Sequence, residues 1–560
     1  MRSASPERVD YDYGAITEWW TNSIAGPEHG FDVRVRPSAD RSQPLVLRVA
    51  VGNGWSVRAD DRGLRFDGDH GERLAYGKLA TRDARGRLLA GRLRPSGGGF
   101  TIEIDDREAV YPLTVDPLLT NLQAKLEGIS IGGEEWAQFG ASVSISGNTA
   151  VIGAPWDDTA AGIQAGNAYV FVRDGETWTQ QAQLASSGIY REIYFGTSVA
   201  ISGDTIVVGA PIDVSAVEPT GEVRGGTAYV FVRNGTTWTQ QARLSSSAGV
   251  KTSLFGSSVA IDADTILVGS YGDTTLAASG GGSVFVFLRS GTNWAQQARI
   301  TDTVAPNNGD GFGYSVALDG DTAVIGAWHD DPNGGNAGSA FVYVRSGTTW
   351  NVQAQLIAPA TTEQSMMGSA VAVDGDTAVV GAPGDSTAAS NTGSAHVFVR
   401  SGTTWAHQAE LVAADASVND QFGNAVALEG DVAVIGAAAD DTAAGLGAGS
   451  VYLFVRSGTT WAQQAQLFHP DGEPQDGFGI SVDIDAGTVL IGCNGDRTAG
   501  GEDAGSAFVF VNEGGSWIEQ AYLQPTGRAS SDHFGRSVAI DGDTAIVGTF
   551  GDDTSAGTNA

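Results

Sequence analysis

The stretch FGYSVALDGDTAVIGAW, residues 312–328, recurs with small changes along most of the chain, and it decides the fold. A fixed period in the observed range of 55 to 60 residues indicates a repeat architecture in which each copy forms one structural unit. The copies begin at Phe139, Phe195, Phe255, Phe312, Met367, Phe422, Phe478 and Phe534.

Each repeat contains four segments with the character of β-strands. In the copy at 312, SVAL alternates in polarity and TAVIG is a continuous apolar run, and the Asp319-Gly320-Asp321 turn between them suits a tight hairpin. A third strand, GSAFVYVR at 338–345, and a fourth, WNVQAQL at 350–356, follow. Because no helical periodicity occurs, residues 118–560 are predicted to form an all-β protein, a β-propeller of four-stranded blades.

The number of blades follows from counting strands. The first, second and fourth strand types each occur eight times, if QAKL at 123–126 is counted as a fourth strand, whereas the third type occurs seven times. We therefore predict eight blades, the last one incomplete because the C-terminal GDDTSAGTNA stops where other copies continue into a third strand. Pairing of QAKL with the last blade would close the ring, and seven blades is the alternative.

Two phrases in the repeat, FG at a strand start and GAP at a strand end, resemble the FG-GAP repeat of the integrin α-subunit propeller and of many bacterial surface and secreted proteins. The resemblance covers about 440 residues and implies a β-propeller used for extracellular recognition. Five copies depart from GAP, reading GSY, GAW, GAA, GCN and GTF at 269, 326, 436, 492 and 548. The phrases occur together at Phe139-Gly140 with Gly153-Ala154-Pro155, at Phe195-Gly196 with Gly209-Ala210-Pro211, and at Met367-Gly368 with Gly381-Ala382-Pro383.

Calcium loops of the integrin type, DxDxDGxxD between the first two strands, are missing from this sequence. Their place is taken by short turns such as Ser202-Gly203-Asp204, Asp374-Gly375-Asp376 and Asp541-Gly542-Asp543. Calcium needs six to eight oxygen ligands, which two or three residues do not supply. We expect ordinary hairpin turns there.

Charge separates two regions of the chain. Residues 1–117 carry 17 Lys and Arg and 18 Asp and Glu, whereas residues 118–560 carry 15 and 47, a net charge of −32. Such a surface repels nucleic-acid phosphate and anionic lipid, and it favours cations, basic partners or neutral ligands such as glycans. The alternative is that the charge only maintains solubility.

Most of these acidic residues fall in the loops between the second and third strands and in those that join one blade to the next, which must emerge on one face. We call it the long-loop face. We expect a protein or glycan ligand to bind there. The face also offers weak candidates for metal ligation. The sequence predicts no cofactor, and calcium is the candidate if a metal binds there. The candidates are the pairs Asp157 and Asp158, Asp330 and Asp331, Asp440 and Asp441, and Asp552 and Asp553, with Asp310, Asp420, Asp476 and Asp532 from the joining loops. Scattered solvated carboxylates are the alternative reading.

Residues 1–117 form a separate unit. Alternating runs such as PLVLRVAV, FTIEID and YPLTVD predict a small β-sandwich-like domain, and EWWTNSIAGPEHGFDV resembles an N-terminal module that precedes repeats in secreted bacterial proteins. Trp19 and Trp20 are expected in its core rather than on a ligand platform. The chain shows no apolar run of signal-peptide or membrane-span length, so either it stays in the cytoplasm or an export signal lies upstream.

The sequence gives little support for an enzyme. None of the seven histidines falls in HExxH, no GxSxG or Walker-type loop occurs, and the single thiol, Cys493, takes the Ala position of a GAP copy, where we expect it to be buried. The sequence therefore predicts a non-catalytic, monomeric, extracellular or cell-surface binding or adhesion protein. A propeller enzyme, either quinoprotein-like or a hydrolase, is the alternative. The uniform lengths of the loops argue against it. The tryptophans that begin each fourth strand are expected to pack between blades rather than stack on a cofactor: Trp178, Trp238, Trp294, Trp350, Trp405, Trp461 and Trp517.

Overall fold

The computed structural model describes residues 1–560 apart from 1, 5–7, 24–25, 37–43, 52–54, 61–62, 69–72, 77–78, 83, 85–88, 90, 97–98, 108, 118–123, 128–136, 160–161, 176, 187–191, 214–224, 247–252, 276–277, 360–361, 470–471, 499–500, 525–529 and 552–560. The described residues contain strands and turns but no helix. Within them, therefore, nothing has the helical length and hydropathy that would cross a membrane. The chain divides into two compact units, residues 1–124 and most of residues 125–560.

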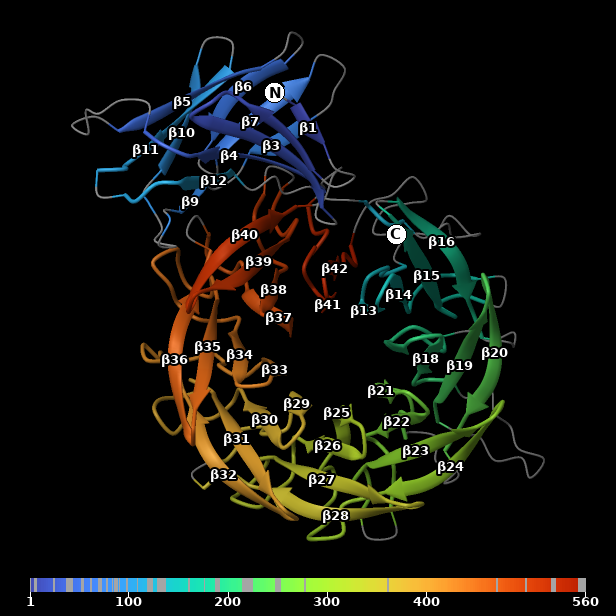
Figure 1. Ribbon diagram of the computed structural model, residues 1–560. Coiled ribbons are helices and arrows are strands. Elements are labelled where there is room, and N and C mark those ends of the chain that lie inside the picture. Colours follow the sequence, from blue (N-terminus) through green and yellow to red (C-terminus); the bar gives the residue numbers. More distant parts are fainter. Residues whose placement is uncertain are drawn as a thin grey trace. The chain divides into compact units, whose positions relative to one another are not determined.

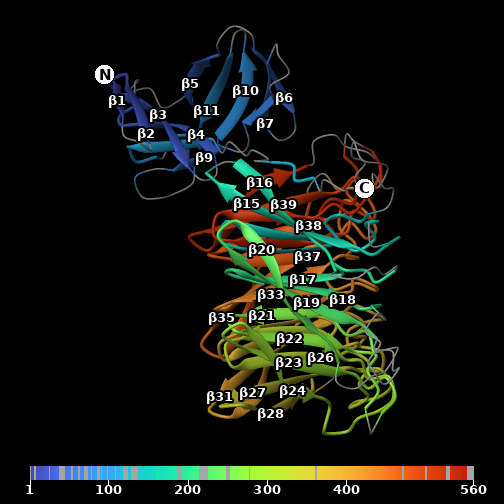
Figure 2. The same cartoon turned by 90° about the vertical axis from the view of Figure 1, so that its right-hand side faces the viewer.

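The described residues of the first unit form three antiparallel sheets (Figure 2). Six strands form the largest sheet, in the order β1 (Arg2–Ala4), β2 (Arg8–Asp12), β3 (Ile16–Ser23), β4 (Gly26–Val33), β12 (Leu113–Pro117) and β9 (Leu79–Arg82). The second sheet has β10 (Gly91–Ser96), β11 (Gly99–Ile104) and β5 (Leu45–Ala50), and the third has β6 (Trp55–Asp60), β7 (Gly63–Gly68) and β8 (Arg73–Tyr76).

One apolar core joins the sheets of this unit. Val33 and Leu113 come from the six-stranded sheet, Leu47 and Ile102 from the second sheet, and Leu64 from the third. This layered packing agrees with the β-sandwich-like domain predicted from the alternating runs. The backbone of Trp19 and Trp20 lies in β3, but their side chains lie outside the described part of the structure, so their predicted place in the core stays a prediction.

The second unit contains eight consecutive antiparallel sheets, which we number as blades 1 to 8 (Figure 1). Blades 1 to 4 are β13 (Ser142–Ser146), β14 (Thr149–Ala154), β15 (Asn167–Asp174) and β16 (Thr177–Leu184); β17 (Ser198–Ser202), β18 (Thr205–Ala210), β19 (Thr227–Asn234) and β20 (Thr237–Leu244); β21 (Val259–Asp262), β22 (Thr265–Ser270), β23 (Ser283–Ser290) and β24 (Asn293–Ile300); and β25 (Phe312–Asp319), β26 (Thr322–Ala327), β27 (Ser339–Ser346) and β28 (Thr349–Leu356).

Blades 5 to 7 repeat this order, and blade 8 has two strands among the described residues. They are β29 (Val371–Asp374), β30 (Thr377–Ala382), β31 (Ser394–Ser401) and β32 (Thr404–Leu411); β33 (Ala425–Glu429), β34 (Val432–Ala437), β35 (Ser450–Ser457) and β36 (Thr460–Leu467); β37 (Phe478–Asp485), β38 (Thr488–Cys493), β39 (Ser506–Glu513) and β40 (Ser516–Leu523); and β41 (Val538–Asp541) with β42 (Thr544–Val547). The first strand of each blade lies innermost and the fourth outermost (Figure 1).

Blade 8 contacts blade 1, so the second unit is a closed ring. The Ser537 hydroxyl donates to the Gly140 carbonyl at 2.7 Å, and the Gly147 N–H donates to Asp541 at 2.6 Å. Equivalent bonds join neighbouring blades inside the array: the Ser315 hydroxyl donates to the Gly368 carbonyl at 2.8 Å. The prediction of an eight-bladed all-β propeller is confirmed, rather than the alternative of seven blades.

The predicted closing strand is wrong in its detail. Residues 124–127 form no strand, and β42 pairs with β41 alone. In complete blades the fourth strand pairs with the third, as β28 does with β27, and no third strand of blade 8 occurs among the described residues. Within the described part of the chain this segment packs instead of pairing, because Leu126 lies against the apolar cluster that contains Ile152 and Ile546.

The FG and GAP residues are explained by the close approach of neighbouring blades. Phe312 is fully buried and packs against Phe341 with the two rings tilted and their centroids 5.2 Å apart. A Cβ added to Gly326 would lie 2.0 Å from the carbonyl oxygen of Gly368 in the next blade, and Gly368 itself has a φ of +92°. The small residues predicted for this crowded region are therefore required sterically.

The short turns predicted to lack calcium join the blades. The Asp374 carboxylate accepts the Gly430 N–H of the next turn at 2.6 Å, and Asp376 pairs with Arg400 at 2.5 Å. These carboxylates therefore serve as contacts between blades and within hairpins rather than only as exposed charges.

Candidate functional site

On the long-loop face, each of blades 1 to 7 carries one buried aspartate at the same position of the repeat. It stands four residues after the Gly of the GAP position, in the loop just beyond the second strand. In blade 4 the Asp330 N–H donates to Ala327 at 3.1 Å and its carbonyl accepts the Gly338 N–H at 2.7 Å, so the residue closes the base of the loop. We call these residues the repeat aspartates, and each is at most 2% exposed: Asp157, Asp213, Asp273, Asp330, Asp385, Asp440 and Asp496.

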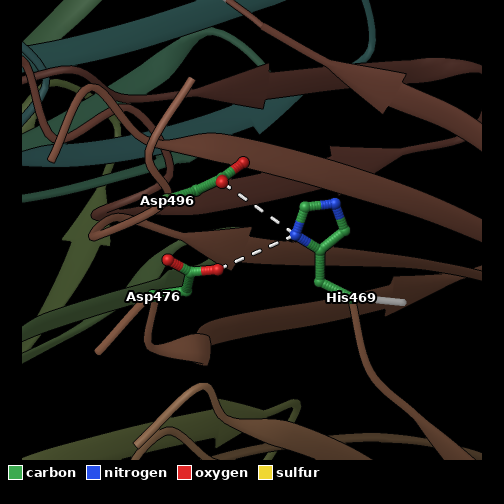
Figure 3. A group of neighbouring side chains, drawn as sticks. All are labelled: His469, Asp476 and Asp496. Carbon is green, nitrogen blue, oxygen red and sulfur yellow. Dashed lines mark ion pairs between the residues drawn. The ribbon is translucent and has the colours of Figure 1, made fainter. Parts of the chain in front are cut away.

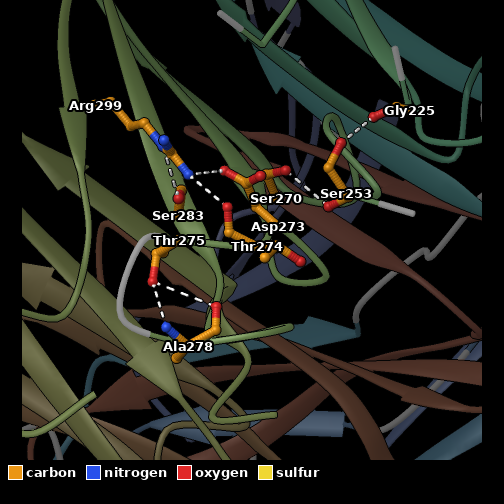
Figure 4. Close-up of polar contacts among 9 residues, drawn as sticks. All are labelled: Gly225, Ser253, Ser270, Asp273, Thr274, Thr275, Ala278, Ser283 and Arg299. Atoms are coloured by element: carbon orange, nitrogen blue, oxygen red, sulfur yellow. Dashed lines mark hydrogen bonds and ion pairs between the residues drawn. The ribbon is translucent and has the colours of Figure 1, made fainter. Parts of the chain in front are cut away.

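Blades 2 and 3 neutralise their repeat aspartates with an arginine from the fourth strand. Arg243 lies 3.0 Å from Asp213, and Arg299 lies 2.8 Å from Asp273. Arg299 also donates to the Ser283 hydroxyl and to the Thr274 carbonyl (Figure 4). A buried carboxylate held in this way has its counter-charge inside the chain.

Neutral donors hold the repeat aspartate in blades 1, 5 and 6. Asp157 accepts from Asn167 and Tyr169, Asp385 accepts from Ser394, and Asp440 accepts from Tyr452 at 2.8 Å. Hydrogen bonds from hydroxyl and amide groups lower the cost of burying a carboxylate, but they do not neutralise its charge.

Blade 4 adds two further carboxylates to its repeat aspartate. Asp302 follows the fourth strand of blade 3, Asp310 precedes β25, and one ligand oxygen from each of these and from Asp330 lies within 4.8 Å of the others. All three side chains are buried. Burial, opposed by the Asn307 N–H and reinforced by the charges of Asp330 and Asp302, raises the pKa of Asp310 to about 7.

Blade 7 uses the same three positions with a different set of side chains. His469, Asp476 and Asp496 correspond to Asp302, Asp310 and Asp330, and His469 Nδ1 lies 3.8 Å from Asp476 and 3.9 Å from Asp496 (Figure 3). All three are buried. An imidazole and two carboxylates form a donor set that suits several divalent metals.

Blade 6 holds a looser acidic group. Asp415 and Asp440 both accept from the Tyr452 hydroxyl, at 2.9 and 2.8 Å. Burial, with the nearby charges of Asp440 and Asp441, raises the pKa of Asp420 to about 6, although the Ser417 N–H opposes the shift. The long-loop face thus differs from blade to blade at positions that the fold otherwise repeats.

The adjacent acidic pairs singled out in the sequence do not converge as pairs. The first member is the buried repeat aspartate, whereas the second accepts a backbone N–H within its own loop: Asp158 from Gln164, Asp331 from Asn336 and Asp441 from Gly447. The structure instead brings Asp330 together with Asp310, and Asp496 together with Asp476. Asp552 and Asp553 lie outside the described residues.

Two residues of these clusters, Asp302 and His469, were missed by sequence reasoning. Each stands two positions after the last apolar residue of a fourth strand, where other blades have Ser246, Ala358 or Ala413. Aligning the joining loops by that strand end would have found them. The reading of scattered solvated carboxylates is wrong for Asp310, Asp420, Asp476 and Asp532, all of which are at most 1% exposed.

An aromatic stack lies beside the blade 4 cluster. The Tyr314 and Trp328 rings stack at 4.6 Å, His329 stacks on Trp328 at 3.7 Å, and Tyr271 meets Tyr314 edge-on at 5.5 Å. Tyr314 is 38% exposed and the other three are partly exposed. Tyr271 and Trp328 occupy the Pro position of GAP, so the departures from that motif were the available signal.

The recurring tryptophans pack between blades, as predicted. From Trp238 to Trp517, each of the six donates its indole N–H at 2.7 to 2.8 Å to a glutamine of the preceding fourth strand. An arginine guanidinium also lies over most of these rings, as Arg345 does over Trp350. Cys493 is fully buried, and burial raises the pKa of its thiol.

Comparison with known proteins gives a family match along the whole propeller. The model described as FG-GAP repeat matches residues 122–171, 178–231, 238–287, 294–343, 350–398, 405–454, 461–510 and 517–560. No curated protein shows significant sequence similarity. Among solved structures, that of Sqt1 from Chaetomium thermophilum gives a TM-score of 0.47 at 13% identity, over 76% of this chain and 98% of that one.

Proposed function

Because the chain belongs to the FG-GAP repeat family, we propose that it is a non-catalytic binding protein that acts outside the cell or at its surface. Proteins with these repeats are typically extracellular, and rigid propellers present loops for recognition. The long-loop face is the recognition surface in this proposal, and a neutral glycan is the ligand class that its exposed groups favour.

The stack of Tyr271, Tyr314, Trp328 and His329 is the observation that carries the proposal. Partly exposed aromatic rings offer a flat apolar surface next to polar groups, which is the usual make-up of a small-ligand site. Burial lowers the pKa of His329, so this imidazole is neutral at pH 7 and adds no charge. A neutral aromatic surface suits the apolar face of a sugar ring.

Among the described residues, Ser394, His396 and His407 resemble a catalytic set. Their burial and hydrogen bonds nevertheless support a non-catalytic role. Ser394 contacts His396 Nε2 at 3.0 Å, and His396 Nδ1 contacts His407 at 3.3 Å. Ser394 and His396 are at most 1% exposed, and Ser394 donates its proton to Asp385. Burial, with the neighbouring His407, lowers the pKa of His396 to about 3, so this ring is a poor general base.

Affinity electrophoresis of the whole chain through gels that contain neutral polysaccharides tests the proposal. We expect retardation by at least one polysaccharide, and loss of that retardation in Trp328→Ala and Tyr314→Ala. The matched control is Val352→Ala, because Val352 is a 42% exposed apolar residue on the outer strand β28. No retardation of the wild type, or equal retardation of all variants, contradicts glycan binding at the stack.

A further inference from the structure

The cluster of Asp302, Asp310 and Asp330 has the make-up of a hard-cation site. All donors are carboxylate oxygens, and one from each residue lies within 4.8 Å of the others. Two oxygens on opposite sides of a Ca²⁺ ion, each at about 2.4 Å, are about 4.8 Å apart, so three oxygens with this spread fit around one ion. Oxygen-only donors favour Ca²⁺, Mg²⁺ or Mn²⁺ over softer metals.

Two oxygens of the cluster are buried without a hydrogen-bond partner. Asp302 binds the Val304 N–H through Oδ1 but leaves Oδ2 unpaired, and Asp310 binds the Asn307 N–H through Oδ2 but leaves Oδ1 unpaired. The two side chains are 7% and 1% exposed. Leaving a buried polar atom unpaired costs about 1–3 kcal/mol, and more for a charged group. These two oxygens therefore point to a ligand that the chain itself does not supply.

Neighbouring blades show what the blade 4 cluster lacks. In blade 3 the repeat aspartate Asp273 faces Arg299, and the position of Asp310 is taken by Ser253 (Figure 4). In blade 4 the position of Arg299 is taken by Gln355, which donates to Asp330 at 2.8 Å. Among the described residues no lysine, arginine or histidine forms an ion pair with any of the three carboxylates. The sequence has thus removed one cation and added two anions at a buried site.

We propose that Asp302, Asp310 and Asp330 together bind one divalent cation, with Ca²⁺ as the best fit. The site lies on the long-loop face, at the opposite end of the strands from the hairpin turns in which integrin-type calcium loops occur. His469, Asp476 and Asp496 occupy the same positions in blade 7, which makes a second metal site there the natural extension. This proposal does not depend on glycan binding, because the carboxylates need a counter-charge whatever ligand the face takes.

Terbium luminescence can report on the blade 4 site alone. A Cβ added to Gly311 would lie 2.7 Å from the Trp328 indole nitrogen, so a metal bound by the adjacent Asp310 lies close to that ring. We expect Tb³⁺ added to the whole chain to emit on tryptophan excitation, and CaCl₂ to displace it. Asp310→Asn should weaken Tb³⁺ and Ca²⁺ binding at this site at least tenfold, whereas Asp476→Asn should leave the emission in place.

Gln355→Arg separates loss of the site from loss of the fold. An arginine at 355 would supply to Asp330 the charge that Arg299 gives to Asp273, so we expect a folded variant that no longer binds metal at this site. Asp264→Asn is the charge-matched control, because Asp264 is exposed on the short-turn face, and it should bind as the wild type does. Calorimetry and thermal shifts with CaCl₂ and with MgCl₂ complete the test.

Three outcomes overturn the proposal. The first is a wild type that shows no heat, no emission and no thermal shift with any of these ions. The second is binding that is unchanged in both Asp310→Asn and Gln355→Arg. The third is stabilisation of the wild type by acid but not by metal, because protons alone would then neutralise the cluster.

Discussion

The indole N–H of Trp350 in blade 4 donates to the side-chain oxygen of Gln297 in blade 3 at 2.7 Å. Both residues lie in fourth strands, and Trp350 is 8% exposed. Arg345 covers the Trp350 ring and donates to Thr265 of blade 3 at 2.7 Å. One recurring tryptophan therefore joins two blades through a hydrogen bond and through the arginine above its ring.

Removing the Trp350 to Gln297 bond should destabilise the propeller slightly and specifically. We expect Trp350→Phe and Gln297→Leu to lower the free energy of unfolding by about 1 kcal/mol each for the lost bond, with further loss from packing for the tryptophan. The double variant should lose less than the sum of the two, because the bond can be lost only once. Chemical denaturation measures all three, and strict additivity would show that the bond adds nothing.

The ring-closing contact can be tested against an equivalent contact inside the array. Asp541 accepts the Gly147 N–H at 2.6 Å, as Asp374 accepts the Gly430 N–H at 2.6 Å. If the ring is closed in solution, Asp541→Ala and Asp374→Ala should lower stability by similar amounts, about 1 kcal/mol for one hydrogen bond. Thermal unfolding compares them. An open array would lose stability with Asp374→Ala and almost none with Asp541→Ala.

The fold was predictable from the sequence because its information is repeated. The period of the FG stretch, the short turn after the first strand and the apolar second strand recur in every copy, so an error in one copy is corrected by the others. Ring closure was less accessible. Residues 124–127 pack by Leu126 against a cluster that contains Ile546, more than 400 positions away in the chain, and local polarity does not reveal whether such a segment packs or pairs as a strand.

The candidate site was predictable only in part, for a physical reason. Aspartate in a Gly-rich loop is normally solvated, and the burial of Asp310 and Asp330 arises from the packing of adjacent blades, which no local window contains. Asp302 and His469 belong to a joining-loop position that varies among blades, so only an alignment of the joining loops by the preceding strand end reveals them. The aromatic stack likewise uses Tyr271 and Trp328, which appear in sequence only as departures from GAP.

The blade 4 cluster should make stability depend on pH when divalent metal is absent. The pKa of Asp310 is raised from 3.8 to about 7, so the folded state holds this proton more tightly than the unfolded state does. Its contribution is therefore present below about pH 4 and is lost as the pH rises towards 7. In EDTA, the wild type should lose more stability between pH 5 and pH 8 than Asp310→Asn does, as measured by urea denaturation at each pH. Parallel pH profiles for the two proteins would contradict the raised pKa.

The ion pair of Arg299 and Asp273 provides the reverse experiment in blade 3. Asp273 is fully buried, and Arg299 is the cation that contacts it at 2.8 Å. Breaking a buried pair from one side leaves an uncompensated charge, which costs about 3–5 kcal/mol, so Arg299→Gln should destabilise strongly even though Arg299 is partly exposed. Adding Asp273→Asn should restore most of that loss, because a neutral amide needs no counter-charge. Urea denaturation of the two single variants and the double variant measures the coupling. If Arg299→Gln were as stable as the wild type, internal charge compensation would not distinguish blades 2 and 3 from blade 4, and the contrast on which the cation site rests would lose its basis.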